Sequence, residues 1–466
     1  MVFSSILFLF YFFVPVVIIY YLLPQKFKNA FLLISSLIFY AWGEPKYIFL
    51  MLFSAVFNYA AGLYVHKFRN NEKMAKRIVI AAVVVNLGIL GVYKYTGFFL
   101  SGFMRFISPD AKILNLILPI GISFYTFQAL SYVIDVYRKD APVQKSIVNF
   151  ALYLSMFPQL IAGPIVRYGD VALQIDNRKE SFEKFSQGFI RFVVGLSKKV
   201  LIANNIGALW NMISSFEYTG LSMGWAWLGI IAFSLQLYFD FSGYSDMAIG
   251  LGKMFGFDFI ENFNYPYISK SATEFWRRWH ISLGTWFREY VYIPLGGNRV
   301  SKRHNMFNLL AVWSLTGLWH GAAWNFVLWG LFFGVILIFE KNYFLEKLKK
   351  TPTFVQHIYA LFVVIISWVM FANDNTANMF HYLKALFNVT TLFTFDAQLL
   401  YNTLSYGVLI VIAIIAATPL PKKLLNKCVG NKRASVVKFI LAILGLIICL
   451  AYLIDDSYNP FLYFRF

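Results

Sequence analysis

Long apolar segments separated by short polar loops are the feature that most constrains how this chain can fold. Hydrophobic residues make up 59% of its 466 residues, and charged residues only 14%. A membrane-spanning helix needs about 20 apolar residues, and inside a bilayer only helices and closed barrels satisfy every backbone polar group. The pattern predicts an all-α, polytopic membrane protein that forms a single domain over residues 1–466.

The candidate spans number roughly ten to thirteen, at about 20 residues per crossing. Pro and Gly interrupt LPIGISFYTF (118–127) and FPQLIAGPIVRY (157–168). Irregular backbone at membrane depth is tolerated where protein buries it or where it lines a cavity, so we expect re-entrant segments here. The candidate spans are 3–23, 30–42, 47–65, 78–100, 113–137, 148–162, 189–213, 224–252, 276–296, 306–340, 354–372, 403–420 and 437–454.

The net charge of +19 comes from basic residues in short loops between apolar segments. This is the positive-inside pattern, so we expect these loops in the cytoplasm and no nucleic-acid ligand. Lys26 and Lys28 follow the first span, and the basic loop 422–438 precedes the last span, so we expect both termini outside the cytoplasm. The other basic clusters lie at 66–77, 167–199, 299–304 and 346–350.

No sequence motif predicts a metal site or a permanently bound cofactor. The two cysteines, Cys428 and Cys449, are too few for a thiolate metal site. There is no H-E-x-x-H and no glycine-rich phosphate loop. GLSMG (220–224) matches G-x-S-x-G, but it joins two apolar helical segments instead of a strand and a helix, so we interpret it as a chance match.

Two histidines, His280 and His320, lie in apolar surroundings, each directly after a tryptophan. Ionisable groups in membrane segments are costly and usually mark functional sites, and histidine titrates near neutral pH. The nearest charged residues to His320 are Arg303 and Glu340, so its surroundings favour a neutral ring that can act as a general base. A histidine bonded to a backbone carbonyl in the bundle core explains the pattern equally well.

The segment 274–290 has the spacing of one continuous helix. Arg277, His280, Gly284 and Arg288 recur at intervals of three and four and therefore share one face. An interfacial helix with snorkelling arginines fits this pattern, as does a helix that presents His280 for positioning or acid–base chemistry. The opposing apolar stripe consists of Trp276, Trp279, Leu283, Trp286 and Tyr290.

Two carboxylates, Asp240 and Asp246, lie inside the apolar segment QLYFDFSGYSDMAIG (236–250). Buried carboxylates can orient a histidine or line a pathway through the membrane. The alternative is structural pairing with an arginine such as Arg277 or Arg278.

Eight segments, in order along the chain, carry a resemblance to a known family. They are MVFSSILFLFYFFVP, LLISSLIFYAWGEP, LPIGISFYTFQALSYVIDVYR, FPQLIAGPIVRY, LYFDFSGYSDMAIGLGKMFGF, NFNYPYISKSATEFWRRWHISLGTWFREYVYIPLGG, GLWHGAAWNFVLWG and SYNPFLYFRF. The chain resembles membrane-bound O-acyltransferases of the alginate and peptidoglycan O-acetylation type. The family's catalytic histidine, in G-x-W-H-G, falls on His320, and its second histidine, in R-x-W-H-x-S, falls on His280.

The resemblance implies a ring of tilted helices around a thinned centre, with a tunnel formed by an inner donor funnel and an outer acceptor funnel. It implies transfer of an acetyl group from cytoplasmic acetyl-CoA, across the bacterial cytoplasmic membrane, to an exported or cell-wall polysaccharide. The segments between residues 236 and 340 would form the catalytic core, with His320 as base, and an extracytoplasmic esterase-like partner would complete the transfer. The substrate-binding residues that we expect are Trp319, Asn325, Arg277, Arg278, Trp279, Asp240 and Asp246.

The tail 456–466 ends in FLYFRF (461–466), which fits F-x-Y-x-x-F. It resembles a C-terminal motif of related acyl-transfer proteins in which the tyrosine is proposed to carry the acyl group. Tyr463 is therefore a candidate acyl carrier, and an aromatic interfacial anchor is the alternative interpretation.

Two other functional classes fit the residues. One is a transporter, either an exporter of a glycan precursor or a proton-coupled carrier that uses His320 and Asp246 as a relay, although the inverted repeats common in transporters are not visible. The other is a non-catalytic scaffold of a polysaccharide export complex.

Overall fold

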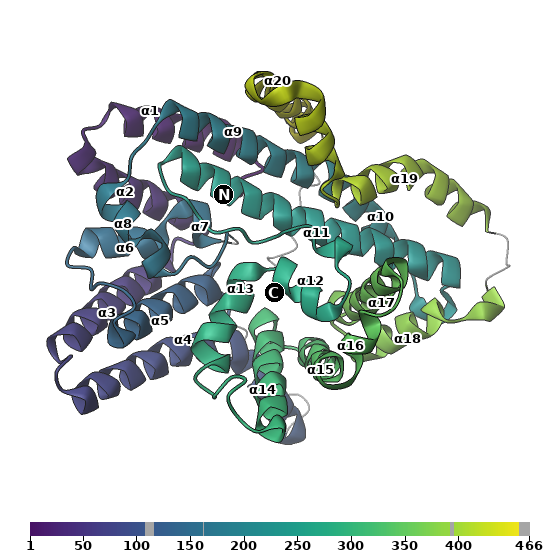
Figure 1. Ribbon diagram of the computed structural model, residues 1–466, viewed down its shortest axis with the longest axis horizontal. Helices are drawn as coiled ribbons and strands as arrows, with labels where there is room; N and C mark the ends of the chain where they lie inside the picture. Colours follow the sequence, from purple (N-terminus) through teal and green to yellow (C-terminus); the bar gives the residue numbers. More distant parts are fainter. Residues whose placement is uncertain (108–115, 162, 392–395, 456–466) are drawn as a thin grey trace. The chain divides into compact units, whose positions relative to one another are not determined.

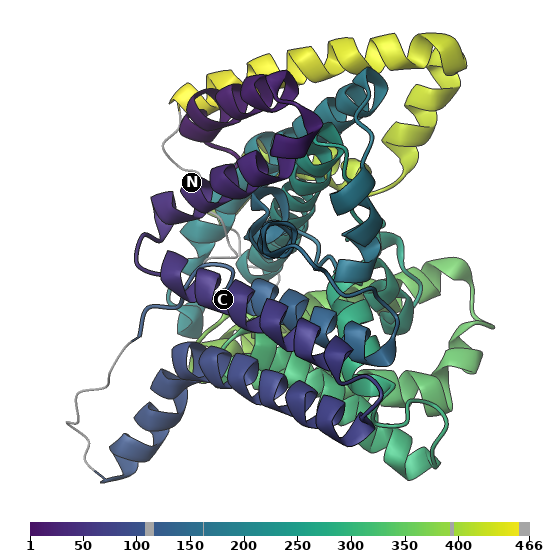
Figure 2. The same cartoon turned by 90° about the vertical axis from the view of Figure 1, so that its left-hand side faces the viewer.

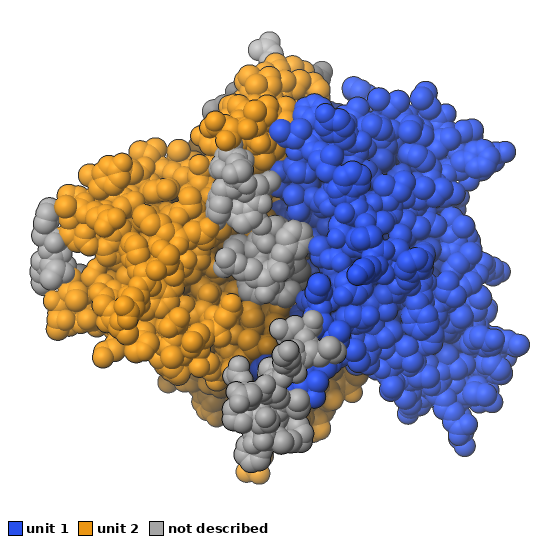
Figure 3. Space-filling model, turned by 180° about the vertical axis from the view of Figure 1, so that it is seen from behind, with its two compact units in different colours: residues 1–193, 244–261 blue, residues 194–243, 262–466 orange. Residues whose placement is uncertain are grey.

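The computed structural model describes residues 1–107, 116–161, 163–391 and 396–455. Every regular element in these ranges is helical, which confirms the predicted all-α membrane fold. The chain packs as two compact units, coloured separately in Figure 3. Unit 1 contains residues 1–193 and 244–261, and unit 2 contains residues 194–243 and 262–466. The ring, its tunnel and the single domain over residues 1–466 stay predictions.

Unit 1 holds the N-terminal helices. They are the π-helical η1 (Leu7–Phe13), α1 (Val14–Leu22), α2 (Gln25–Gly43), α3 (Ile48–Lys67), α4 (Glu72–Ile107), α5 (Ile122–Arg138), α6 (Ile147–Ser155), α7 (Phe157–Leu160) and α8 (Tyr168–Asn177). Two long helices, α9 (Phe182–Ser197) and α11 (Met223–Met254), contribute residues to both units.

Unit 2 holds the remaining helices. They are η2 (Lys198–Asn204), α10 (Asn205–Ser214), η3 (Tyr218–Gly220), η4 (Pro266–Ile268), α12 (Ala272–Arg278), α13 (Ile281–Phe287), η5 (Arg288–Tyr292), α14 (Lys302–His320), α15 (Trp324–Phe339), η6 (Glu340–Phe344), α16 (Leu345–Leu348), α17 (Thr353–Ala372), α18 (Thr376–Leu386), η7 (Val389–Thr391), α19 (Ala397–Ala416) and α20 (Leu420–Asp455).

Among the described residues, seven helices are long and apolar enough to cross a membrane. The count is below the ten to thirteen predicted spans because several of those are divided into shorter helices. The predicted span 306–340, for example, consists of α14 and α15, and 148–162 consists of α6 and α7. The seven are Ile48–Lys67, Glu72–Leu100, Phe182–Ser214, Trp324–Leu348, Thr353–Ala372, Ala397–Ala416 and Val436–Asp455; Leu7–Leu22 is a shorter apolar helix.

Helices α3, α4 and α5 lie side by side in unit 1 (Figures 1 and 2). Between α3 and α4, the buried side chains of Asn58 and Asn86 exchange two amide hydrogen bonds, with N···O distances of 3.0 and 2.8 Å. An amide is costly in apolar surroundings unless it is hydrogen-bonded. The reciprocal pair therefore fixes the register of α3 against α4.

The two interrupted segments, 118–127 and 157–168, pack directly on each other in unit 1. Gly121 precedes α5 and has a left-handed backbone, with φ of 75°. A Cβ at this position would lie 2.6 Å from the carbonyl oxygen of Leu160, the last residue of α7. Both interruptions are thus present as breaks between helices, while their re-entrant course in a membrane stays a prediction.

Replacing Gly121 with alanine is expected to lower the thermal stability of the purified protein. The left-handed backbone alone costs a residue with a Cβ about 1–2 kcal/mol, and the new methyl group would overlap the Leu160 carbonyl. Tryptophan fluorescence during heating in detergent would report the apparent unfolding midpoint. Gly88→Ala is the matched control, because a Cβ there meets nothing within 4 Å. Equal midpoints for the two variants would contradict this account of the break.

Candidate active site

His320 is the last residue of α14 and lies at the bend of a helical hairpin. Residues 321–323 connect α14 to α15, and Gly321 is extended, with φ of −164° and ψ of 153°. The two helices approach closely: Gly330 of α15 would place a Cβ 3.2 Å from the Cα of Gly317. Small residues at such a crossing allow the backbones of membrane helices to come together. The close crossing brings the end of α14 against the first turns of α15.

His320 is only 6% exposed, and aromatic side chains of unit 2 surround its ring. Its ring centroid lies 5.1 Å from that of Trp329, 5.3 Å from Phe371 and 5.1 Å from Trp319, all nearly perpendicular. Trp329 comes from α15 and Phe371 from α17. The sequence had placed His320 in an apolar interior, and the structure agrees.

His280 lies between two short helices, which corrects the expectation of one continuous helix over 274–290. Helix α12 ends at Arg278 and α13 begins at Ile281. His280 itself has a left-handed backbone, with φ of 45° and ψ of 52°. The chain therefore turns at this residue, and the predicted shared face of Arg277 and His280 does not continue into α13.

A buried asparagine, Asn262, holds the turn at His280. Its Oδ1 lies 3.2 Å from His280 Nδ1 and accepts a hydrogen bond of 2.8 Å from the hydroxyl of Ser282. Its backbone carbonyl accepts a hydrogen bond of 3.0 Å from the Ile281 N–H. Because Oδ1 can only accept, this contact places the His280 proton on Nδ1 and leaves Nε2 with its lone pair.

The His280 ring stays neutral near pH 7. The residue lies outside the seven candidate spans, is 1% exposed, and burial lowers its pKa to about 3. Its Nε2 is buried and has no hydrogen-bond partner among the described residues. A buried acceptor without a partner is costly, so this nitrogen can receive a hydrogen bond from water or from a substrate group.

Trp319 links the two histidines. Its ring centroid lies 5.9 Å from that of His280 and 5.1 Å from that of His320. The tryptophan is 3% exposed and therefore buried between them. The residues of the two W-H pairs, far apart in sequence, thus belong to one cluster in unit 2.

Glu340 anchors the helix that leads to His280. This glutamate, at the start of η6, has no exposed surface. Its carboxylate accepts hydrogen bonds from the N–H groups of Ala272 (2.7 Å) and Thr273 (2.8 Å) and from the Thr273 hydroxyl (2.6 Å). The side chain of Ser271 accepts the next N–H, that of Glu274, at 3.0 Å. A negative charge at a helix N-terminus is stabilising, so Glu340 fixes α12 to the end of α15.

The remaining expected substrate-binding residues of this segment have different environments. Trp279 is 3% exposed and packs against Trp368, with ring centroids 5.0 Å apart. Arg277 is exposed, and Arg278 is bound to Glu274 at 2.8 Å. Asn325, at the start of α15, is fully buried; its amide donates to the Met370 carbonyl at 3.2 Å, while its Oδ1 has no partner among the described residues.

Asp240 and Asp246 pair with cations other than the expected Arg277 or Arg278. Within unit 1, Asp246 accepts hydrogen bonds from Arg191 at 3.0 and 2.8 Å. Within unit 2, Asp240 forms an ion pair of 2.6 Å with Lys199, and both side chains are 3% exposed. Both carboxylates are thus paired, as expected, but the partners are Arg191 of α9 and Lys199 of η2 instead of Arg277 or Arg278.

Tyr463 lies outside the described residues.

Among the residues that are described, no group of three or more His, Cys, Asp or Glu side chains has the arrangement of a metal site. The described part of the candidate active site is therefore built from His320, His280, Trp319 and their buried neighbours.

Sequence reasoning missed Asn262, Glu340, Trp329 and Phe371 as parts of the site. In the sequence, Glu340 was considered only as the nearest charged residue downstream of His320. A lone glutamate close after a strongly apolar helix is a signal that could have drawn attention to it, because a buried carboxylate requires donors.

The comparisons with known proteins agree with the resemblance. The family described as MBOAT, membrane-bound O-acyltransferase family, matches residues 138–381. A probable alginate O-acetylase of Pseudomonas putida is 39% identical over 492 aligned positions, which cover 100% of both chains. A probable alginate O-acetylase of Azotobacter vinelandii is 43% identical over 83% of this chain and 78% of its own length. A peptidoglycan O-acetyltransferase of Helicobacter pylori is 36% identical over 83% and 80%.

Replacing Glu340 with alanine is expected to lower the apparent unfolding midpoint, because it leaves the buried N–H of Ala272 and the part-buried N–H and hydroxyl of Thr273 without their acceptor. An unsatisfied buried donor costs about 1–3 kcal/mol. Glu340→Gln keeps one carbonyl acceptor and should lose less. Glu346→Gln is the control: it removes an exposed carboxylate paired with Lys349 and should leave the midpoint unchanged. A wild-type midpoint for Glu340→Ala would show that the cap does not hold α12.

Proposed function

Since this chain belongs to the membrane-bound O-acyltransferase family, we propose that it transfers an acetyl group from cytoplasmic acetyl-CoA to an exported or cell-wall polysaccharide. The names of the relatives support the acetyl group and the polymer: alginate O-acetylase in two of them and peptidoglycan O-acetyltransferase in the third. The protein is thus an O-acyltransferase in the membrane; acetyl-CoA as donor is part of the proposal.

The observation that carries the proposal is the buried His320 at the hairpin bend, in contact with Trp319 and Trp329. As general base, a ring nitrogen of His320 takes the proton of an acceptor hydroxyl. The hydroxyl oxygen attacks the thioester carbonyl, an ester bond forms, and the carbon–sulfur bond breaks. The thiolate of coenzyme A leaves and takes up the proton from the histidine, which returns the base to its neutral form.

His280 serves as a positioning or donor-side residue in this proposal. Its Nδ1 is held by Asn262, so its position follows from the turn between α12 and α13. Buried polar atoms near the two histidines support a site that admits polar groups. The indole N–H groups of Trp276 and Trp329 and Oδ1 of Asn325 have no hydrogen-bond partner among the described residues, and such atoms call for water or a ligand.

In this proposal the acetyl group reaches the polysaccharide in two steps. Tyr463 takes the acetyl group as an ester on its phenolic oxygen, and an extracytoplasmic esterase-like partner then moves it to the polymer. The position of FLYFRF (461–466) after α20, whose first half carries the basic residues of 422–438, supports an extracytoplasmic tail.

The transporter alternative has less support. A proton relay through Asp246 requires a carboxylate that is open to proton exchange, whereas Nε and Nη2 of Arg191 both donate to Oδ1 of Asp246.

Replacing His320 with alanine is expected to reduce acetyl transfer from labelled acetyl-CoA by roughly 10²–10⁴-fold, the usual contribution of a general base. The assay uses the purified full chain in lipid nanodiscs and measures coenzyme A release. His304→Ala is the matched control, because His304 is an exposed histidine on the same helix. Normal turnover in His320→Ala would exclude this residue as the base.

Replacing Tyr463 with phenylalanine is expected to abolish labelling of the chain by acetyl-CoA and to stop acetylation of the polymer, because the phenolic oxygen is lost. Tyr458→Phe is the control within the same tail. Acid-stable label on the purified protein and acetate content of the polymer are the two measurements. Full polymer acetylation in Tyr463→Phe would exclude the carrier and leave the role of His320 untouched.

A further inference from the structure

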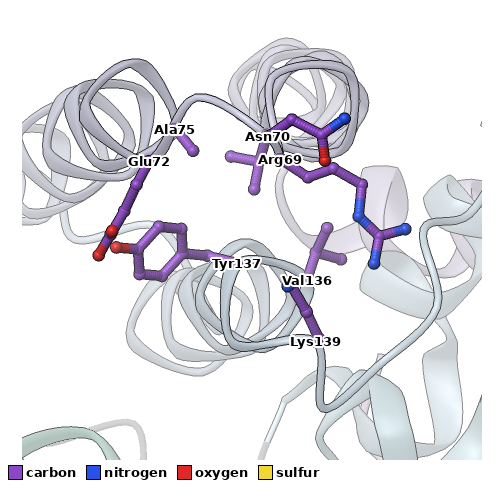
Figure 4. Close-up of a pocket in the computed structure, with 8 residues that line it drawn as sticks. Arg69, Asn70, Glu72, Ala75, Val136, Tyr137 and Lys139 are labelled. Carbon is purple, nitrogen blue, oxygen red and sulfur yellow. The ribbon is translucent and has the colours of Figure 1, made fainter.

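A surface pocket of about 400 Å³ lies in unit 1, outside the candidate active site (Figure 4). It forms where the end of α3, the start of α4 and the end of α5 meet. Its apolar floor consists of the buried residues Val65, Ala75 and Val136. Its polar rim consists of Arg69, Asn70, Glu72, Tyr137 and Lys139.

The position of this pocket along the chain corresponds to a membrane boundary. Helix α3 ends at Lys67 and α4 begins at Glu72, and both are candidate spans. Residues 68–71 therefore turn the chain where two membrane-spanning helices end. Lipid headgroups occupy this level of a bilayer. A pocket at this position is therefore open to lipid headgroups.

The rim carries two cations that form no ion pair with a carboxylate of the described residues. Arg69 and Lys139 are exposed, and neither forms an ion pair within the described part of the chain. Arginine and lysine are the side chains that bind phosphate oxygens, arginine through a planar fork and lysine as a point charge. The two side chains together suit a phosphate group.

The rim also carries a negative charge, which argues against a simple anion as the ligand. In Figure 4 the side chains of Glu72 and Tyr137 lie on one side of the pocket, and that of Arg69 lies on the other. A carboxylate beside a bound anion is repulsive, but it favours an ammonium group. A ligand with a phosphate and an amine, held a short distance apart, matches both sides.

We propose that this pocket binds the headgroup of a phospholipid that carries a primary amine, of the phosphoethanolamine type. The phosphate lies against Arg69 and Lys139, and the ammonium group lies against Glu72 and the Tyr137 hydroxyl. The Asn70 amide completes the polar rim, and the apolar floor accommodates the glycerol backbone. The bound lipid stabilises the ends of α3, α4 and α5 at the membrane surface. This site is independent of the proposed acetyl transfer.

The test measures which lipids stay bound to the purified full chain. The protein is prepared in detergent with equal amounts of phosphatidylethanolamine and phosphatidylglycerol, and native mass spectrometry counts the retained lipids. The wild type is expected to retain the amine-bearing lipid in preference. Arg69→Ala combined with Lys139→Ala should reduce its retention about tenfold, a change equivalent to about 1.4 kcal/mol. Soluble phosphoethanolamine should compete if the headgroup alone is recognised, and its failure to compete would assign the site to the intact lipid.

The Glu72→Gln variant tests the selectivity. Without the carboxylate, retention of phosphatidylethanolamine should fall and that of phosphatidylglycerol should rise. Lys76→Ala combined with Arg77→Ala is the control, because it removes two exposed charges of the same helix that do not line the pocket. Equal retention of the two lipids by the wild type would overturn the proposal. An equal loss in the control variant would also overturn it, since retention would then reflect charge alone.

Discussion

Backbone hydrogen bonding at the ends of broken helices is the constraint on which the candidate active site depends. The first N–H groups and last carbonyl groups of a helix lack partners within it, and within a membrane domain water does not readily supply them. The seven-residue helix α12 therefore depends on other parts of the chain. Glu340 and Ser271 accept its first N–H groups, and the Asn262 carbonyl accepts the Ile281 N–H just beyond its C-terminus. A short helix held in this way can position Trp279 and His280.

The class of fold could be predicted from sequence because an apolar run of about 20 residues has few alternatives to a membrane helix. The break at His280 could not be predicted from sequence. The apolar pattern continues through Trp279 and Ile281, and no glycine or proline marks the left-handed backbone between them. A non-glycine residue with positive φ is uncommon, so local preference favoured the continuous helix, and tertiary hydrogen bonds decided otherwise.

The two histidines of the candidate site could be predicted from sequence. The residues that hold them in place could not. A buried carboxylate must find a cation or N–H donors. For Asp240 and Asp246 this rule predicted an ion pair but with the wrong partners, and Glu340 was not recognised as a buried carboxylate. The partner of Asp246 is 55 residues upstream, and the N–H donors to Glu340 are 67 and 68 residues upstream. Sequence spacing carries no signal for such distant pairs, since the choice of partner depends on how whole helices pack.

The hairpin of α14 and α15 couples the position of His320 to a polar cluster at the opposite end of the same helix. There, the Lys341 ammonium group donates to Asn305 Oδ1 at 2.8 Å, and Asn305 donates to the Gly297 carbonyl at 2.8 Å. Asn305 and His320 are separated by an uninterrupted helical rod of about 22 Å at 1.5 Å per residue. One residue inserted into this rod would rotate the imidazole by about 100° about the helix axis and turn it away from Trp329. The length of α14 therefore determines the direction in which the His320 ring points.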